Sequence, residues 1–492
     1  MKTLGIDMGS SSVKVSLMDV PTGRCIASST NPRTEMTIDA PRAGWAEQDP
    51  EMWWRYICDG IRAVGAEHSL ADVRAIGITY QMHGLVMLGA EGKPLRKSII
   101  WCDSRAVGTG AEAFDALGHE RCLTHLLNSP GNFTASKAAW VRRNEPEIFA
   151  RTDKFMLPGD YAVYRLSGEI STTESGLSEQ ILWDFAEGRR ADFVAEHYGI
   201  PARMIPNAQS SIGISAFTNG ETETLFGIPA GTPISYRAGD QPNNAFSLNV
   251  LDAGEVAATG GTSGVVYGVA DTRRYDPQSR VNTFLHVNHS AAAPRYGILL
   301  CINGTGIMNS WLRRNIAAGM DYDAMNRLAA SVAAGSEGLL AIPFGNGAER
   351  VLGNRTTGAA FAGIDLNRHT TAHMIRAVHE GIAYSFRYGM DIMRETGVNP
   401  SVIRAGKANL FLSPIFRQTL ATLTGADIEL FNTDGSLGAA RGAALGAGLY
   451  KSREEAFASL TRLETVRPEP SWREALEAGY GAWRREVESR LE

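Results

Sequence analysis

The chain opens with a strand, a Gly/Ser turn and a second strand, and this hairpin constrains the possible fold more than any other feature. Leu4 and Ile6 lie in the first apolar run, Gly9-Ser10-Ser11-Ser12 makes the turn, and residues 13–17 alternate between apolar and polar side chains. Alternation with a period of two is the pattern of a half-buried strand. The sequence therefore predicts a tight antiparallel hairpin at the N-terminus.

The next elements alternate in type. Residues 25–27 can pair back as a third strand, Trp53 to Ala66 has helical spacing, and Val73 to Thr79 reads as a strand. Strands and helices in alternation predict an α/β fold. A similar arrangement returns in the middle of the chain, where a strand from Pro233 ends at Gly239-Asp240 and a Gly/Thr/Ser turn separates two further strands. We interpret this as a weak duplication of architecture, without a fixed repeat period.

A chain of 492 residues is too long for one core, so two domains are expected, 1–240 and 241–492, with the boundary near residues 236–248. Later segments are helical: Thr371 to Glu395 and Pro414 to Leu423 are amphipathic, and the Gly/Ala-rich stretch from Ser436 to Tyr450 indicates a helix packed closely against a neighbour. The tail from Ser471 to Glu492 is expected to be a charged surface helix that can pack back on the first domain.

Composition excludes several functions. A net charge of −5 gives no basic surface for nucleic acid. The five cysteines are scattered and never spaced as CxxC, which favours reduced thiols and no structural zinc. The first residues lead directly into the strand, without a basic segment before an apolar stretch, so we expect neither a signal peptide nor a membrane helix, and a cytoplasmic protein.

Two turns have the chemistry of phosphate binding. In the first, Asp7 precedes Gly9, Ser10 and Ser11; the second is Thr259-Gly260-Gly261-Thr262-Ser263. Glycine lets the backbone approach a phosphate, successive amides and hydroxyls donate hydrogen bonds, and a carboxylate can hold magnesium. Either turn alone is more often a simple hairpin connection. The chain lacks both the GxxxxGK[ST] loop and a GxGxxG after the first strand, which argues against P-loop and Rossmann sites.

Motifs spread over nearly the whole chain resemble those of the FGGY carbohydrate kinases. In order they are Gly5-Ile6-Asp7-Met8-Gly9-Ser10, Gly44 to Trp54, Gln81-Met82-His83-Gly84, Trp101-Cys102-Asp103-Ser104-Arg105, Phe133 to Lys137, Leu157 to Tyr161, Ala238-Gly239-Asp240-Gln241 and Gly260 to Gly264. The resemblance implies an actin/hexokinase-like (ribonuclease H-like) fold with a central cleft. It also implies ATP and Mg²⁺ as cofactors and a small sugar as substrate, and it leaves a homodimer open.

The resemblance also implies roles for single residues. Asp240 would be the general base, and Asp7 with Asp240 would form the magnesium site. An Asx-turn or helix-cap aspartate is the alternative for Asp240. Phosphoryl transfer needs positioning, charge neutralisation and a carboxylate to accept the hydroxyl proton, which agrees with these roles.

The sugar would be bound by residues from several motifs. Candidates are Gln81, Met82, His83, Trp101, Asp103, Asn132 and Gln241. Trp101 can instead fill core, and Asp103 with Arg105 can instead form a surface ion pair. His83 can instead be a core histidine.

The nucleotide would be bound by residues of both turns and of later loops: Gly9, Ser10, Ser11, Lys14, Gly260, Gly261, Thr262, Ser263, Gly304, Gly406, Lys407 and Asn409. The chain departs from the family in the last of these, because Ala405-Gly406-Lys407-Ala408-Asn409 stands where relatives carry Gly-Gly-Gly-Ala.

The leading hypothesis is ATP-dependent phosphorylation of D-xylulose to D-xylulose 5-phosphate. The alternatives are a kinase for ribulose, fuculose, gluconate or glycerol, an actin-like ATP-binding module, and a catalytically inactive relative that acts as a sensor.

Overall fold

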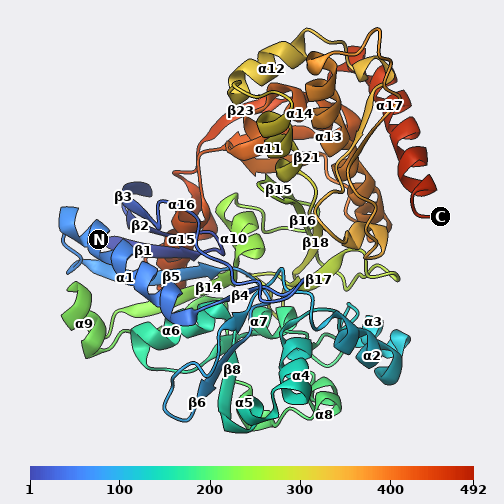
Figure 1. Cartoon of the computed structure of the whole chain (residues 1–492). Coiled ribbons are helices and arrows are strands. Elements are labelled where there is room, and N and C mark those ends of the chain that lie inside the picture. Colours follow the sequence, from blue (N-terminus) through green and yellow to red (C-terminus); the bar gives the residue numbers. More distant parts are fainter. The chain divides into compact units, whose positions relative to one another are not determined.

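The computed structural model describes residues 1–492 and divides into two compact units (Figure 1). Unit 1 contains Met1–Leu251, Phe284–Tyr296 and Thr433–Leu460, and unit 2 contains Asp252–Thr283, Gly297–Asn432 and Thr461–Glu492. The chain thus returns twice to unit 1 after leaving it. This differs from a single division at residue 240, which local sequence patterns suggested because they carry no signal for a returning segment.

Unit 1 is built on a six-stranded sheet with the order β13-β14-β5-β1-β2-β3. Its strands are β1 (Lys2–Met8), β2 (Val13–Asp19), β3 (Arg24–Asn31), β5 (Val73–Tyr80), β13 (Ile212–Phe217) and β14 (Pro233–Gly239). The expected N-terminal hairpin is confirmed, because β1 and β2 pair antiparallel from Lys2–Asp19 to Met8–Val13. Strands β1, β5 and β14 are parallel, and their register pairs Met8 with Tyr80 and Tyr80 with Gly239. The carboxyl ends of three strands therefore meet at one edge.

The two faces of this sheet bury different side chains. Leu4, Ile6 and Met8 face the apolar core that contains α1 (Pro50–Glu67) and α6 (Pro158–Ser167). The alternate residues face α15 (Gly435–Gly446), which lies beside β1 and β5 although it is far along the chain (Figure 1). Contact with this helix is close, because a Cβ on Gly77 would lie 2.0 Å from the carbonyl oxygen of Ala439. The Gly/Ala-rich stretch is thus a closely packed helix, as its composition predicts.

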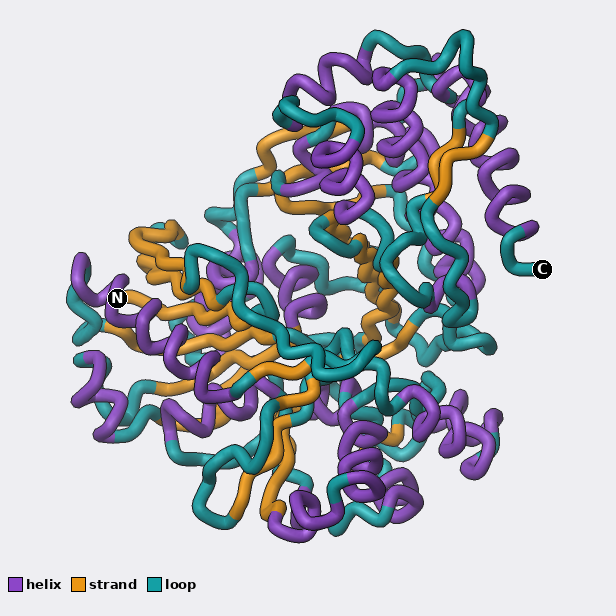
Figure 2. The backbone as a smooth tube through the Cα atoms, viewed as in Figure 1, coloured by secondary structure: helices purple, strands orange, loops and turns teal.

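Shorter elements complete unit 1. The strands are β4 (Glu47–Gln48), β6 (Val86–Gly89), β7 (Ser98–Ile99), β8 (Thr152–Met156), β9 (Thr172–Thr173), β10 (Trp183–Asp184), β11 (Arg189–Arg190) and β12 (Ala208–Gln209). The helices are α2 (Val107–Leu117), α3 (His119–His125), α4 (Thr134–Asn144), α5 (Pro146–Arg151), α7 (Glu174–Glu179), α8 (Asp192–Tyr198), η1 (Ala202–Met204), α9 (Gly220–Phe226), α10 (Asp240–Ser247) and α16 (Arg453–Phe457). Figure 2 shows the strands of the main sheet of unit 1 with helices beside them.

Unit 2 has a second sheet, whose main body has the order β18-β16-β15-β21-β22-β23. Its strands are β15 (Val256–Gly260), β16 (Gly264–Ala270), β18 (Tyr296–Ile302), β21 (Val402–Gly406), β22 (Asp427–Phe431) and β23 (Arg462–Val466), with β17 (Asn282–Leu285), β19 (Leu340–Ile342) and β20 (Ala360–Ala362) besides. The helices are α11 (Gly306–Asn315), α12 (Tyr322–Ala330), η2 (Ser336–Gly338), η3 (Arg350–Leu352), α13 (Thr371–Glu395), η4 (Asn409–Leu412), α14 (Pro414–Thr424) and α17 (Pro470–Ser489).

The last helix, α17, is a core element of unit 2. Leu476, Tyr480, Trp483 and Val487 form its buried stripe, and the Trp483 indole donates to the carbonyl oxygen of Ala341 over 3.0 Å. It packs on α13 and α14, while Arg473, Glu474, Glu477 and Arg484 are exposed, so the expected charged surface helix is present and has a buried apolar stripe in addition. Spacing of three and four residues between these apolar positions is the signal that the many charges in the tail obscured.

Two further expectations concern the whole chain. All five cysteines are free thiols. No helix has the length and apolar character needed to cross a membrane.

Candidate active site

Asp7, Gln81 and Asp240 come together because each stands at the carboxyl end of one of three neighbouring parallel strands. Asp7 is the next-to-last residue of β1, Gln81 follows β5 directly, and Asp240 follows β14 and starts α10. The amide of Gln81 also donates to the carbonyl oxygen of Met8 over 2.8 Å. Ligands of open α/β sheets bind at this edge, where strand ends present side chains and helices begin.

The carboxyl groups of Asp7 and Asp240 both have raised pKa values. Burial raises the pKa of Asp7 to about 7, and the negative charges of Asp240 and Asp434 add to this effect against the opposing charge of Lys14. Burial also raises the pKa of Asp240 to about 6, while hydrogen bonds from the backbone amide and side chain of Gln241 oppose the shift. A buried carboxyl whose pKa lies near neutrality is suited to accept a proton or to hold a divalent cation.

Asp240 is not a helix cap. Gly239 occupies the N-cap position of α10 and has no side chain that could cap the helix. Asp240 is the first residue of the helix, one position after the cap. The alternative that Asp240 is an N-cap aspartate is therefore wrong. Its hydrogen bonds with the backbone and side chain of Gln241 orient the carboxylate.

Hydrogen bonds to the backbone carbonyl groups of the first Gly/Ser turn hold it in place. The Gly9 amide donates to the Ser12 carbonyl over 3.0 Å, the Met36 amide to the Ser11 carbonyl over 2.8 Å, and the Gln48 side chain to the Ser10 carbonyl over 2.7 Å. These contacts fix the loop between β1 and β2 from outside. Amides and hydroxyls of the turn are the groups that can face an anion.

Lys14 lies behind this turn and forms an ion pair with Asp434, with 2.7 Å between Nζ and Oδ2. Asp434 is the N-cap of α15, and its Oδ1 accepts from the Leu437 amide over 3.0 Å and from the Ser436 hydroxyl over 2.7 Å. The returning segment therefore positions a predicted phosphate ligand. Reasoning from sequence missed Asp434; the pattern Asp-Gly-Ser before a Gly/Ala-rich helix is the cap signal that pointed to it.

His83 is held in an unusual backbone conformation. Its φ is +61°, which non-glycine residues rarely adopt, and its Nδ1 lies 2.9 Å from the carbonyl oxygen of Glu179. The ring packs edge-on against Phe133, with 4.9 Å between centroids. Lys137 donates from Nζ to the His83 carbonyl oxygen over 2.8 Å. Strain maintained by surrounding contacts is common where a residue must be aimed at a ligand.

Lys137 is a second residue that sequence reasoning missed as a contributor. Its side chain is buried, and burial lowers the pKa of its ammonium group to about 7 in spite of the nearby Asp103. Besides the His83 carbonyl it bonds that of Ile100 over 3.0 Å. Lys137 therefore connects the loop after β5 to the segment that contains Trp101 and Asp103.

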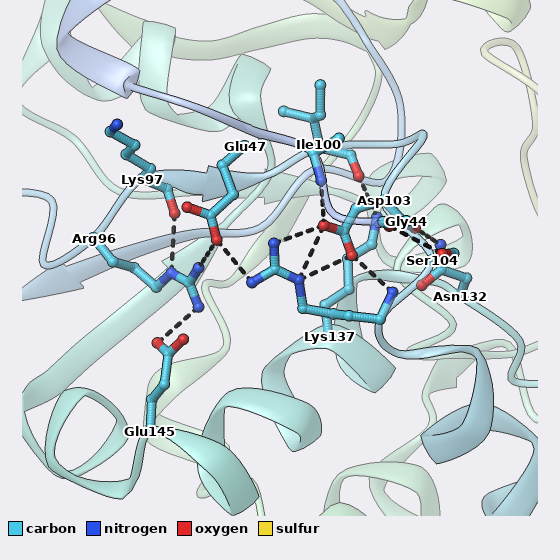
Figure 3. A network of polar contacts seen from close by, with 12 residues as sticks. Gly44, Glu47, Arg96, Lys97, Ile100, Asp103, Ser104, Asn132, Lys137 and Glu145 are labelled. Atoms are coloured by element: carbon cyan, nitrogen blue, oxygen red, sulfur yellow. Dashed lines mark hydrogen bonds and ion pairs between the residues drawn. The ribbon is translucent and has the colours of Figure 1, made fainter. Parts of the chain in front are cut away.

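Asp103 belongs to a buried network with Glu47 and Arg96 (Figure 3). Its pair with Arg105, whose side chain is 1% exposed, is therefore not a surface pair. Asp103 is 0% exposed and accepts from Arg105 and from the Ala46 amide, the latter over 2.6 Å. Arg105 also contacts Glu47 over 2.7 Å, and Glu47 with Glu145 binds Arg96. The Asp103 carboxylate is thus already used by protein donors, so it positions the site, and the surface alternative is wrong.

Trp101 and Asn132 lie beside this network. Trp101 is 38% exposed and donates from Nε1 to the Ser10 hydroxyl over 3.3 Å, so it does not fill core. The Asn132 amide donates to the carbonyl oxygen of Asp103. These contacts place both side chains within the same region of unit 1 as the Gly/Ser turn and the Asp103 network.

Several buried acceptors of unit 1 have no hydrogen-bond partner in the protein. They include the side-chain oxygens Gln81 Oε1, Asn132 Oδ1, Glu179 Oε1 and Gln241 Oε1. Gln81, Asn132 and Gln241 are expected to contact a sugar, whereas other buried atoms without a hydrogen-bond partner, such as those of Ser98 and Gln180, are not. Buried polar atoms are rarely left unpaired, so this group requires a ligand, water or another donor.

In unit 2, the second Gly/Thr/Ser turn and the 405–409 loop follow adjacent parallel strands. Strand β15 leads into the turn and pairs with β21, which leads into the loop. Gly306, at the start of α11, completes the arrangement, because a Cβ there would lie 2.0 Å from the carbonyl oxygen of Gly261. Leu410 packs on Gly260, with 2.8 Å between its Cβ and one built on the glycine. The structure thus brings the expected nucleotide-side turn and loop together within unit 2.

Two expected nucleotide ligands have other contacts. The Gly304 amide donates to Glu349 Oε1 over 2.8 Å, and a Cβ on this glycine would collide with the Pro343 carbonyl oxygen at 2.0 Å. Lys407 pairs with Glu464 over 3.2 Å. Gly304 is therefore explained by packing, and Lys407 is available to a phosphate only if it leaves Glu464.

The fold is a two-unit α/β architecture that solved structures of a xylulose kinase and a gluconate kinase share. The chain belongs to the FGGY family of carbohydrate kinases, whose N-terminal domain matches residues 2–247 and whose C-terminal domain matches residues 256–449. It is accordingly a carbohydrate kinase that transfers a phosphoryl group from ATP to a sugar.

Individual relatives support this membership. The xylulose kinase of Escherichia coli (strain K12) is 30% identical over 459 residues, which cover 93% of this chain and 92% of that protein. Among solved structures, xylulose kinase from Rhodospirillum rubrum has a TM-score of 0.86 at 24% identity, covering 99% of each chain. Gluconate kinase from Lactobacillus acidophilus has a TM-score of 0.90 at 21% identity, covering 100% of this chain and 98% of that one. Similar folds thus occur in kinases named for different sugars.

Proposed function

We propose that this enzyme phosphorylates D-xylulose to D-xylulose 5-phosphate, with Asp240 as general base and Mg²⁺ bound with the help of Asp7. The observation that carries the proposal is the meeting of Asp7, the Gln81-Met82-His83 segment and Asp240 at one sheet edge. A relative named for xylulose that aligns over 93% of the chain supports this substrate over other sugars.

In the reaction, the sugar hydroxyl attacks the γ-phosphorus while Asp240 accepts its proton. The new O–P bond forms as the bond from phosphorus to the bridging oxygen of ADP breaks, and the electron pair leaves with ADP. Asp240 must be ionised at the start, which its pKa of about 6 permits at neutral pH. The hydrogen bonds from Gln241 keep the carboxylate directed at one position.

The residues present fit a magnesium ion. Asp7 offers a partly buried oxygen ligand near a second carboxylate, and burial together with the negative charge of Asp240 raises its pKa, a cost that a bound cation would relieve. Bound there, the ion would neutralise charge on the transferred phosphoryl group. Asp7, Lys14 and the Gly9–Ser11 turn are the phosphate ligands in this proposal, and Gly260–Ser263, Gly406 and Asn409 are nucleotide ligands.

The unpartnered buried oxygens support a polyhydroxy substrate. Gln81, Asn132 and Gln241 each present an amide oxygen without a protein donor. All are acceptors, and a ligand rich in hydroxyl groups supplies donors. His83, Met82 and Trp101 would add contacts to the carbon chain. Asp103 would act by holding the loop that carries Trp101, because its own oxygens already accept from Arg105.

The test is a panel of sugars assayed for ADP release with ATP and Mg²⁺: D-xylulose, ribulose, fuculose, gluconate and glycerol. We expect kcat/KM for D-xylulose to exceed the others by at least about tenfold, the order of magnitude that one well-placed hydroxyl contact contributes. A higher kcat/KM for another sugar would replace the substrate but keep the kinase. ATP hydrolysis at the same rate with and without every sugar would support an ATP-binding module instead. A cytoplasmic location and a homodimer stay predictions of the sequence.

A further inference from the structure

Glu179 is a fully buried carboxyl group that the mechanism above does not use. It is the last residue of the short helix α7 and is 2% exposed. Its backbone carbonyl oxygen lies 2.9 Å from Nδ1 of His83, in the segment that is expected to contact the sugar. The backbone of Glu179 therefore contacts the segment of unit 1 that is expected to bind the sugar.

The carboxyl end reaches the catalytic strand. A Cβ built on Gly239, the residue before Asp240, would lie 2.9 Å from Glu179 Oε2 and 2.6 Å from Cγ of Met82. Glu179 and Met82 thus both touch the backbone at the point where the general base begins. Any side chain at Gly239 would displace one of them.

The second oxygen, Oε1, has no hydrogen-bond partner in the protein although it is buried. Another buried carboxyl in unit 1, Asp160, differs in having a cation beside it: its Oδ1 lies 3.1 Å from Nη1 of Arg237, and its Oδ2 accepts from the Leu157 amide over 3.1 Å. No arginine or lysine makes an ion pair with Glu179. The carboxyl group of Glu179 interacts with the hydroxyl group of Tyr80 instead, and it lacks the ion-pair partner that a buried carboxyl normally has.

The surroundings of Glu179 favour its uncharged form. Burial raises the pKa of Glu179 well above its ordinary value, the negative charges of Asp160 and Asp240 act in the same direction, and a hydrogen bond with Tyr80 and the charge of Lys137 oppose them. A protonated carboxyl group has one O–H donor and one carbonyl acceptor. Such a group can hydrogen-bond to a hydroxyl or carbonyl group of a neutral sugar. It has no positive charge that would attract the carboxylate of an aldonate.

We propose that Glu179 is a specificity-determining residue, whose carboxyl group binds a hydroxyl or carbonyl oxygen of an uncharged sugar next to the hydroxyl that Asp240 deprotonates. This inference rests on the proposed function, because it assigns a residue to the sugar site of the kinase. It extends that function by adding a ligand from α7, a helix outside the motifs that identify the family here.

The experiment compares Glu179→Ala and Glu179→Gln with the wild type on the neutral sugar that the wild type uses best and on its monodeoxy analogues. We expect Glu179→Ala to lower kcat/KM on the parent sugar by about tenfold to a hundredfold, mainly through the KM for sugar, with the KM for ATP unchanged. On the analogue that lacks the contacted oxygen, the variant and the wild type should agree within about threefold, since the contact is then absent from both. Glu179→Gln should keep most activity, because an amide retains a donor and an acceptor.

A matched control is Glu380→Gln in unit 2. Glu380 is 1% exposed, but its oxygens accept from Arg376, Ser336 and the Gly335 amide. Its replacement should affect the parent sugar and every analogue by the same factor.

The outcomes separate the two proposals. An equal loss on all analogues for Glu179→Ala, like that of the control, would show a structural role and overturn the inference. Unchanged kcat/KM on the parent sugar would overturn it too. If Glu179→Ala does not fold, Glu179→Gln decides. It should keep most activity on the parent sugar, and a loss of the same size on the parent sugar and on every analogue would overturn the inference. A wild type that phosphorylates no sugar of the panel would refute the proposed function itself.

Discussion

Asp7 and Gly435 are in direct contact: a Cβ added to Gly435 would lie 2.2 Å from Oδ2 of Asp7. The first residue of α15 therefore forms part of the wall around the carboxylate at the end of β1. Asn243 of α10 secures the same point, because its side chain donates to the Gly435 carbonyl oxygen over 3.0 Å. A segment from near the C-terminus thus fixes the strand that carries Asp7 to the helix that starts with Asp240.

Replacing Gly435 by alanine should impair catalysis. The added methyl group has no room beside Asp7, so either the carboxylate or the N-terminus of α15 must shift. Overpacking of this kind costs about 1–3 kcal/mol of stability, and misplacement of a catalytic group by about 1 Å lowers kcat by about a hundredfold. Steady-state kinetics and thermal unfolding measure both effects.

The control for this prediction is Gly108→Ala. Gly108 lies in α2, and a Cβ there would meet nothing within 4 Å. Alanine is favoured over glycine inside a helix by about 1 kcal/mol, so this variant should be as stable as the wild type or more stable, with unchanged kcat. Equal kcat for the two variants would contradict the assigned contact between α15 and Asp7.

Asp240→Asn should abolish most turnover without loss of stability. Removal of a general base lowers kcat by about a hundredfold to ten-thousandfold, while sugar affinity should stay within about tenfold. Burial raises the pKa of Asp240 in the folded protein, which means that the ionised carboxylate opposes folding above its unfolded pKa. The neutral amide removes that penalty, so the melting temperature at pH 7–8 should be equal or higher. A variant with wild-type kcat would refute the role of Asp240.

The acid side of the pH profile should report Asp7 and Asp240 together. Their pKa values of about 7 and about 6 are raised, so the ionised forms that the reaction needs are lost as the pH falls through this range. The two groups repel each other and titrate as a pair. Mg²⁺ stabilises the ionised forms, so raising its concentration should move the acid limb of kcat/KM for ATP to lower pH. An acid limb near pH 4 at every Mg²⁺ concentration would contradict this assignment.

Two charged neighbours of Asp7 test the same pH profile, because their removal should shift its acid limb in opposite directions. Asp434 raises the pKa of Asp7 and Lys14 lowers it. Asp434→Asn keeps a residue that caps helices well, but it removes a negative charge, so the acid limb should move to lower pH. Lys14→Met should move it to higher pH and raise the KM for ATP. Shifts in the same direction for both variants would show that these charges do not act on Asp7.

Gly306→Ala should separate nucleotide binding from sugar binding. A methyl group there collides with the carbonyl oxygen of Gly261, in the second Gly/Thr/Ser turn of unit 2. We expect the KM for ATP to rise by about tenfold or more, because the turn must move away from its phosphate-binding geometry, while the sugar affinity in the absence of nucleotide is unchanged. Calorimetry with the sugar and kinetics with varied ATP test the two parts. A weakened sugar affinity with a normal KM for ATP would contradict the assignment of this turn to nucleotide binding.

Much of the fold was readable from local patterns. Alternation in residues 13–17 predicted β2, the Gly/Ala content after Ser436 predicted the close packing of α15, and Asp7 and Asp240 were recognised as aspartates at strand ends. The charges of the tail predicted the exposed face of α17, but they dominate its composition and concealed the buried apolar stripe around Trp483. Asp103 was left open between a sugar ligand and a surface pair, and its burial excludes the surface pair.

By itself the sequence determined the hairpins, the aspartates at the ends of strands and the membership in the FGGY family, because these depend on residues close together along the chain or on their order. Only the tertiary structure decided that Gly435 limits the room around Asp7, that Lys137 holds the carbonyl group of His83, and that Glu179 reaches Gly239 with an oxygen left unpaired. The physical reason is that these contacts join segments far apart in the sequence. Their energy depends on burial and on which donor meets which acceptor, and neither is recorded in local residue patterns.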